Sequence, residues 1–151
     1  MTEPDNKDSS PLRTREKVEI WRSVMEVHAA VLREIEAELH KNHSLTAREF
    51  DTLVNIPDDG VKMKDLVHRV VLSQSALSRL VDRLQQRNLI MKTDVPGDSR
   101  VALLRLTDEG RTVLRAAARS NAAAVERALS SRLDQAEMLT LGQLMDKVRN
   151  S

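Results

Sequence analysis

Hydrophobic side chains recur every three or four positions along most of this chain, and that spacing is typical of amphipathic helices. Capping patterns mark several of the expected starts, such as Thr46 followed three residues later by Glu49. Helices are therefore expected over residues 12–41, 46–55, 64–70, 73–87, 108–131 and 134–148.

The helices at the two ends of the chain carry broad apolar faces. The face of the first helix comprises Val18, Trp21, Val24, Met25, Val31, Leu32, Ile35 and Leu39. The face of the last helix comprises Met138, Leu141, Leu144, Met145 and Val148. A single domain of this size cannot cover both faces, which favours a two-fold homodimer. The alternative is an intramolecular bundle in which the first and last helices cover each other.

The shorter helices in the middle of the chain predict a helix-turn-helix. The helix over residues 46–55 is expected to turn Phe50, Leu53 and Val54 inward. Ser73 is expected to cap the helix over residues 73–87, and Asn88 to end it in a left-handed conformation. This helix has a buried stripe of Leu77, Leu80, Val81 and Leu84 and an outward polar face of Ser75, Arg79, Asp82 and Gln86, with Ser78 and Arg83 on the flanks.

A charged hairpin follows the helix-turn-helix directly. Two strands are expected over residues 89–93 and 101–106, with a turn at Val95-Pro96-Gly97. Thr107 then caps the helix over residues 108–131. The predicted fold is mainly α with a small β-hairpin wing, which makes it a winged helix-turn-helix with dimerisation helices at both ends.

The charge of the chain is concentrated in this middle region. The net charge is only +1, which argues against a polycation that coats nucleic acid without specificity. Residues 62–105 nevertheless carry nine basic and four acidic residues, a net charge of +5, so the rest of the chain carries −4. One basic segment in an otherwise acidic chain indicates a phosphate-binding surface, and a solvated surface of mixed charge is the alternative.

Composition excludes several other classes of protein. The chain has no cysteine, so disulfides and thiol switches are excluded, and no apolar run approaches the roughly 20 residues that cross a bilayer. No secretory signal is evident, and a cytoplasmic location is expected. No phosphate-cradling glycine loop is present, so an enzyme is not expected. His40 and His43 have no obvious third ligand nearby, so no metal or cofactor is expected.

The wing and the helix after it also resemble a known family. The resemblance lies in Asp98-x-Arg100 with Leu104-x-Leu106-Thr107-x-x-Gly110, in the segment Ser73-Gln74-Ser75-Ala76-Leu77-Ser78-Arg79-Leu80-Val81-Asp82-Arg83-Leu84, and in Leu89-Ile90-x-Lys92. These motifs are similar to those of the MarR family of bacterial transcriptional regulators. Asn88, Lys92 and Ser99 depart from the glycine, arginine and arginine that are common there.

This resemblance implies a division of labour along the chain. Residues 1–11 are expected to form a disordered tail, residues 12–45 a dimerisation helix, residues 46–107 the winged helix-turn-helix DNA-binding domain, and residues 108–151 further dimerisation helices. The implied function is a homodimeric repressor of transcription, which a small-molecule effector releases from a pseudo-palindromic operator. A winged-helix module that binds protein or RNA is the alternative.

The outward face of the helix over residues 73–87 is expected to bind the major groove. Arg79 is the first candidate for a contact to guanine or phosphate, and Asp82 either holds Arg79 or Arg83 in place or accepts from cytosine. The full set of expected DNA contacts is Lys62, Lys64, Ser73, Gln74, Ser75, Ser78, Arg79, Asp82, Arg83, Lys92, Asp98 and Arg100. Plain solvent exposure is the alternative for the helix residues.

The wing and the effector site complete the expectations. Asp98 is expected to restrain Arg100, which reaches the minor groove or its phosphates, and the alternative is an ion pair that only pins the hairpin. The family implies a small aromatic or anionic effector bound between the DNA-binding and dimerisation regions. Trp21 and His28 are possible lining residues of that site, or ordinary core residues.

Overall fold

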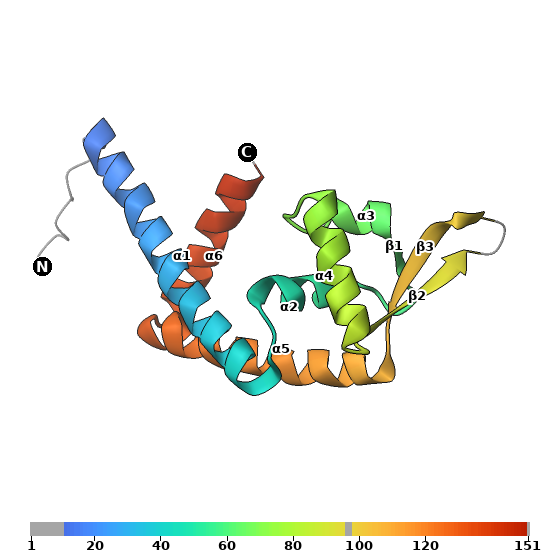
Figure 1. The fold of residues 1–151 in the computed structure, drawn as a ribbon. Coiled ribbons are helices and arrows are strands. Elements are labelled where there is room, and N and C mark those ends of the chain that lie inside the picture. The colour runs from blue at the N-terminus through green and yellow to red at the C-terminus, as the bar shows by residue number, and fades with distance from the viewer. Residues whose placement is uncertain (1–10, 96–97, 151) are drawn as a thin grey trace, which may run out of the picture.

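The computed structural model of the protein describes residues 11–95 and 98–150, apart from the side chains of residues 94–101. The elements along the chain are α1 (Thr14–His43), α2 (Ala47–Val54), β1 (Val61–Lys62), α3 (Met63–Val67), α4 (Gln74–Gln86), β2 (Ile90–Val95), β3 (Asp98–Leu106), α5 (Asp108–Ala128), a 3₁₀ turn (Ser130–Arg132) and α6 (Gln135–Arg149). Figure 1 shows α2, α3, α4 and the hairpin gathered over one end of α5, while α1 and α6 rise from its other end. The predicted class, mainly helical with a small hairpin, is confirmed.

Side-chain caps set several of the helix starts that the sequence predicts. The Thr46 side chain accepts from the Glu49 amide, and the Glu49 carboxylate accepts from the Thr46 amide, which completes the capping box of α2. Ser73 and Thr107 cap α4 and α5 in the same way. Asn88 has the predicted left-handed conformation, with a φ of 57°.

Several boundaries differ from those expected. The first helix extends to His43, because it ends at Ser44, which takes a left-handed conformation. The strand β1 was not predicted; it has only two residues and pairs with Leu103 and Leu104 of β3. The helix α3 ends at Val67 rather than at residue 70. The hairpin strands are longer than expected, and residues 1–10 of the expected tail lie outside the described residues.

The sheet has the strand order β1-β3-β2, and both neighbouring pairs are antiparallel. Ile90 of β2 lies opposite Leu106 of β3, and Lys92 lies opposite Leu104. The predicted turn at residues 96–97 lies outside the described residues.

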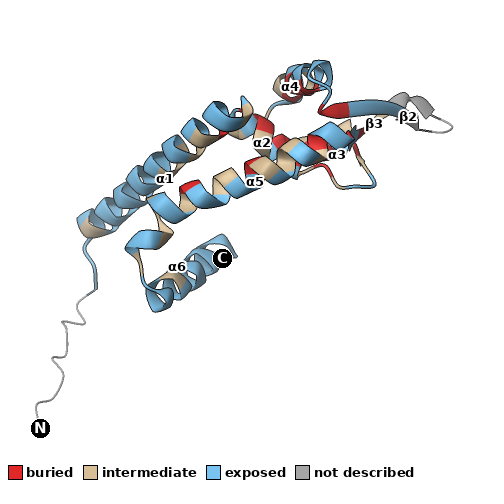
Figure 2. Cartoon of the chain, turned by 90° about the horizontal axis from the view of Figure 1, so that it is seen from below, coloured by how far each residue is buried: buried red, intermediate tan, exposed pale blue. Residues whose placement is uncertain are grey.

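The hydrophobic core lies in the winged lobe, which we define as α2, α3, α4, the sheet and the first turns of α5 (Figure 2). Its fully buried side chains include Leu53, Leu66, Leu77 and Leu104. The expectation for α2 was wrong in part, because Val54 is 53% exposed whereas Thr52 is buried. Eight residues give this helix only two turns, and the buried face falls on positions 49, 52 and 53.

The helices α1 and α6 leave large apolar side chains uncovered in the protomer. Trp21 is 62% exposed and Leu144 is 54% exposed, and Figure 2 shows the first half of α1 and nearly all of α6 as exposed. The other exposed residues of these two helices are Val18, Ile20, Val24, Met25, Val27, Leu139, Met145 and Val148. The first and last helices therefore do not cover each other as an intramolecular bundle would. Among the described residues, no helix is long and apolar enough to span a membrane.

The junction between the wing and α5 predicts a strict requirement for glycine at position 110. A Cβ at Gly110 would lie 2.0 Å from the Leu89 carbonyl oxygen. We expect Gly110→Ala to lower the free energy of unfolding by roughly 1–3 kcal/mol, because backbone atoms must shift to admit the methyl group. Chemical denaturation at a fixed protein concentration measures this.

Gly142→Ala is the matched control, because within the protomer no heavy atom outside its own helix backbone and its chain neighbours lies within 4 Å of the Cβ that it would add to α6. This variant should be as stable as the wild type or more stable, since alanine favours a helix over glycine by about 1 kcal/mol. Equal stability of the two variants would contradict the steric argument.

Candidate nucleic-acid interface

The helix α4 has one buried apolar face and one exposed polar face, as the sequence predicts. Leu77, Val81 and Leu84 are fully buried and Leu80 is 3% exposed. The exposed face comprises Ser75, Arg79, Asp82 and Gln86, with Arg83 also exposed and Ser78 half-buried on the flank. This arrangement presents hydroxyl, guanidinium and amide groups on the outer face of the second helix of a helix-turn-helix, which suits contacts in a DNA major groove.

A side-chain cap marks the start of α4. The Ala76 amide donates to the Ser73 hydroxyl over 3.3 Å, and the Ser73 and Ser75 hydroxyl oxygens lie 3.4 Å apart. Gln74 is exposed beside them. The N-terminal end of this helix therefore offers short polar side chains and free backbone amides, both of which suit phosphate.

The partner of Asp82 differs from the one expected. The Lys92 ammonium donates to the Asp82 carboxylate over 2.6 Å, whereas Asp82 was expected either to hold Arg79 or Arg83 or to accept from cytosine. The reason is that β2 packs against α4. Side chains two positions apart in a strand point to the same side, so Lys92 lies on the same side of β2 as the buried Ile90. Lys92 therefore links the wing to α4.

Arg83 pairs with a residue that the sequence marked only as a helix cap. The Glu49 carboxylate, with a side chain 8% exposed, lies 3.8 Å from Arg83 Nε and 3.7 Å from Arg87 Nη1. Arg87 was not among the predicted site residues. Its one sequence signal is its place at the end of α4, where a basic side chain suits a helix C-terminus.

The remaining predicted contacts lie on the same lobe or beyond the described side chains. Lys62 is half-buried in β1, and Lys64 is exposed in α3. The side chains of Asp98 and Arg100 lie outside the described residues, so their predicted ion pair stays a prediction.

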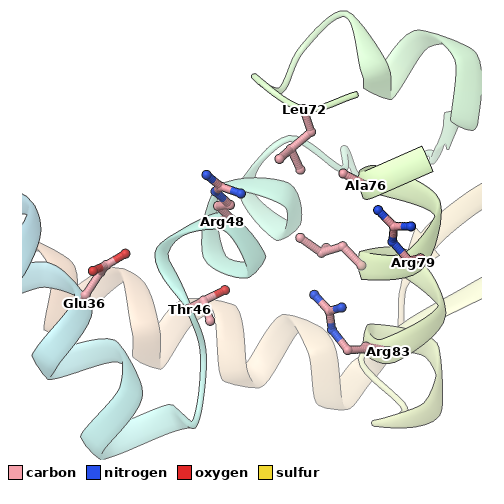
Figure 3. Close-up of a pocket in the computed structure, with 8 residues that line it drawn as sticks. Glu36, Thr46, Arg48, Leu72, Ala76, Arg79 and Arg83 are labelled. Atoms are coloured by element: carbon pink, nitrogen blue, oxygen red, sulfur yellow. The ribbon is translucent and has the colours of Figure 1, made fainter. Parts of the chain in front are cut away.

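A cavity of about 470 Å³ lies between α1, α2 and α4. Figure 3 shows Arg79 and Arg83 projecting from α4 toward this space, with Arg48 of α2 across from them. The other lining residues are Glu36, Thr46, Leu72, Ala76 and Leu80. Three guanidinium groups around one cavity, against a single carboxylate, suit an anionic ligand.

The residues predicted to line an effector site are elsewhere. Trp21 and His28 are exposed on α1, and neither lines this cavity, nor are they core residues in the protomer. His43 Nε2 shares a hydrogen bond of 2.8 Å with the Ser120 hydroxyl of α5. No group of three potential metal ligands occurs within residues 11–95 and 98–150, as far as their side chains are described.

A winged helix-turn-helix, with a polar exposed face on α4 and a net charge of +5 over residues 62–105, defines the class of protein, a DNA-binding regulator. A sequence model of the MarR family matches residues 43–101. The HTH-type transcriptional repressor MdtR of Bacillus subtilis (strain 168) is 30% identical over 112 residues, which cover 74% of this chain and 72% of MdtR. The chain belongs to the MarR family of transcriptional regulators, whose members are regulators and not enzymes.

Two further relatives show how far the similarity extends. The HTH-type transcriptional regulator PecS of Dickeya dadantii (strain 3937) is 30% identical over 77 residues, which cover 48% of this chain and 46% of PecS. The chain thus matches less than half the length of that relative. Sco3205, a MarR family regulator from Streptomyces coelicolor solved in complex with DNA, is 27% identical with a TM-score of 0.78, covering 95% of this chain and 91% of Sco3205.

The cap of α4 yields a prediction for stability. Ser73→Ala removes the acceptor for the Ala76 amide and should lower the free energy of unfolding by about 1 kcal/mol. Ser73→Asp should keep most of that stability, because a carboxylate caps a helix as well as a hydroxyl does. Thermal unfolding of both variants measures the difference, and an equal loss in both would show that the cap is not what Ser73 contributes.

Proposed function

We propose that this protein is a sequence-specific, homodimeric repressor of transcription, which binds an operator of two half-sites. The observation that carries the proposal is the exposed polar face of α4, whose opposite face is buried in the packed core beside the wing. Two named relatives support it, since MdtR is a transcriptional repressor and Sco3205 has been solved in complex with DNA.

In this proposal, residues 46–107 form the DNA-binding domain and α4 enters the major groove. Arg79 contacts guanine or phosphate, and Gln74, Ser75 and Ser78 contact base edges or phosphates around it. Ser73, Lys62 and Lys64 contact the backbone. Asp98 restrains Arg100, which reaches the minor groove or its phosphates.

Lys92 and Asp82 act as a pair in DNA binding. A carboxylate on the face that meets DNA repels phosphate, but the 2.6 Å contact with Lys92 neutralises it. The lysine can in turn place its remaining donors on a phosphate. Arg83, whose side chain is 59% exposed and paired with Glu49, lies at the edge of the same surface.

The dimer is proposed to form through residues 12–45 and 108–151. Both α1 and α6 expose large apolar side chains in the protomer, and apolar surfaces of this extent are rare on monomers. Burial against a second copy would pair identical surfaces about a two-fold axis, which places two α4 helices on one side of the assembly.

The effector is proposed to be a small anion, aromatic or aliphatic, that binds in the cavity lined by Arg48, Arg79 and Arg83. An anion there would compete with Glu49 for Arg83, and with DNA for Arg79, so it would weaken operator binding. A screen of small carboxylates for release of the bound duplex tests this assignment.

Two substitutions separate base reading from phosphate binding. Duplexes that the wild type recovers from a randomised pool serve as the probe, each compared with a scrambled duplex. Arg79→Ala should reduce the preference for the recovered sequence by about 1–3 kcal/mol. Lys92→Ala should weaken both duplexes alike and lower the slope of affinity against salt by about one counterion.

Arg115→Ala is the control, because it removes an exposed arginine from the middle of α5. It should change neither quantity. Equal loss of preference in the Arg79 and Lys92 variants would overturn these two roles, and failure of the wild type to enrich any duplex would overturn the proposed function.

The dimer makes a separate prediction. Leu144→Glu places a charge on the exposed apolar face of α6 and should convert the protein to a monomer at micromolar concentration. Val54→Glu is the matched control, since Val54 is equally exposed but lies on α2. Sedimentation velocity distinguishes the two, and a Leu144→Glu variant that stayed dimeric would contradict the assigned interface.

A further inference from the structure

Arg87 joins the end of the recognition helix to the end of the long N-terminal helix. Its Nη1 donates to the Ser44 carbonyl over 2.9 Å, and its Nη2 donates to the His43 carbonyl over 3.2 Å. The last carbonyls of a helix have no partner within the helix, and they form the negative end of its dipole. A guanidinium placed there satisfies the last carbonyl of α1 and that of its C-cap with the single side chain of Arg87, the C-cap of α4.

Glu49 holds this guanidinium from a third element. Its carboxylate accepts from the Thr46 amide over 2.9 Å, so the capping box of α2 fixes its position. The same carboxylate lies 3.7 Å from Arg87 Nη1 and 3.8 Å from Arg83 Nε. Because the Glu49 side chain is only 8% exposed, solvent screens these charges less than it screens a surface pair.

Three helices therefore meet at one cluster of charge, which we call the Glu49 cluster (Glu49, Arg83 and Arg87, with the carbonyls of His43 and Ser44). Arg87 donates to the two carbonyls at the end of α1, and its charge lies 3.7 Å from the carboxylate of α2. A planar fork of donors can reach two carbonyls from two nitrogens at once, whereas a lysine has a single ammonium nitrogen to place.

The position of this cluster matters for binding to two half-sites. In a dimer built on α1, the separation of the two α4 helices depends on the angle between α1 and α4 within each protomer. Half-sites on one face of a duplex are about 34–36 Å apart, and each inserted base pair moves one of them by about 3.4 Å and rotates it about the axis. A small change of the angle between α1 and α4 therefore moves the two α4 helices away from the separation that the half-sites require.

We propose that Arg87 is a positioning residue, which holds α4 at a fixed angle to α1 and thereby sets the half-site spacing that the dimer accepts. This rests on the proposed function of the protein. Arg87 contacts no DNA in this role; it acts through the orientation of α4.

Affinity for two duplexes tests the proposal. One is the tightest duplex that the wild type recovers from a randomised pool, and the other carries one additional base pair between the half-sites. We expect Arg87→Met to bind the first duplex roughly tenfold more weakly, as for the loss of one charge-assisted hydrogen bond, while its affinity for the second changes little. The ratio of the two affinities should therefore fall toward one, and Arg87→Lys should lie between Arg87→Met and the wild type.

Arg105→Met is the matched control. It removes one positive charge and one arginine-to-carbonyl hydrogen bond from the winged lobe, since Arg105 Nε donates to the Asp59 carbonyl over 3.2 Å. That bond does not involve α1, so the ratio of affinities should stay at the wild-type value. Circular dichroism establishes that each variant is folded, and Glu49→Gln provides a second test if Arg87→Met does not fold.

Amide hydrogen exchange without DNA gives an independent reading of the same cluster. Arg87→Met should accelerate exchange over residues 43–49 and leave the core strands unchanged. A wild-type ratio of affinities in Arg87→Met overturns the positioning role while the proposed function stands. If the wild type enriches no duplex, the proposed function fails. Exchange over residues 43–49 that is unchanged by the substitution shows that Arg87 does not hold the end of α1, which overturns the positioning role.

Discussion

The burial of one face of α4 is the constraint on which the rest of the structure depends. Leu77, Val81 and Leu84 are fully buried at spacings of four and three residues, and each contributes about 1.5–3 kcal/mol of burial energy. A helix turns through 100° per residue, so this face also fixes where every other side chain points. Arg79 is exposed because the opposite face of the helix is buried, and a rotation by one residue would expose leucines. The polar surface of α4 is thus a consequence of core packing.

A second constraint fixes the wing relative to that helix. The Thr107 amide donates to the Leu89 carbonyl, and the Thr107 hydroxyl donates to the Asn88 carbonyl over 2.6 Å. The same hydroxyl accepts from the Gly110 amide, so it also starts α5. Asn88 lies between the end of α4 and the start of β2, so one threonine joins the end of α4, both ends of the hairpin and α5. The wing therefore cannot change its angle without disturbing the cap of α5.

Much of this could be predicted from the sequence, because caps and apolar periodicity are local signals. Thr46, Ser73 and Thr107 each mark a helix start correctly, and the four buried residues of α4 follow from spacing alone. The strand β1 could not be predicted, since its two residues form a strand only by pairing with β3. The ion-pair partners of the charged residues could not be predicted from the sequence either.

Two of those partners show why. Asp82 pairs with Lys92 because β2 packs beside α4, and sequence distance carries no information about that neighbour. Glu49 is legible as a cap, yet its second role toward Arg83 and Arg87 depends on how α2 lies against the end of α4. Local signals locate elements, whereas the charge pairs that join elements require the tertiary arrangement.

The distribution of these contacts bears on how a regulator of this shape can be controlled. The helix α1 has 30 residues but buries only Leu39 fully, near its C-terminal end. Its polar contacts with the rest of the chain cluster at the same end: Glu38 pairs with Arg127 over 2.7 Å, His43 with Ser120, and Arg87 caps the last turn. A partly exposed pair such as Glu38 with Arg127 contributes little, typically about 0–1 kcal/mol. Arg87 meets Glu49, whose side chain is only 8% exposed, so solvent screens this contact less. A ligand acts on the angle between α1 and α4 only by changing these contacts, and a preference of a few kcal/mol between two angles is enough to select one of them.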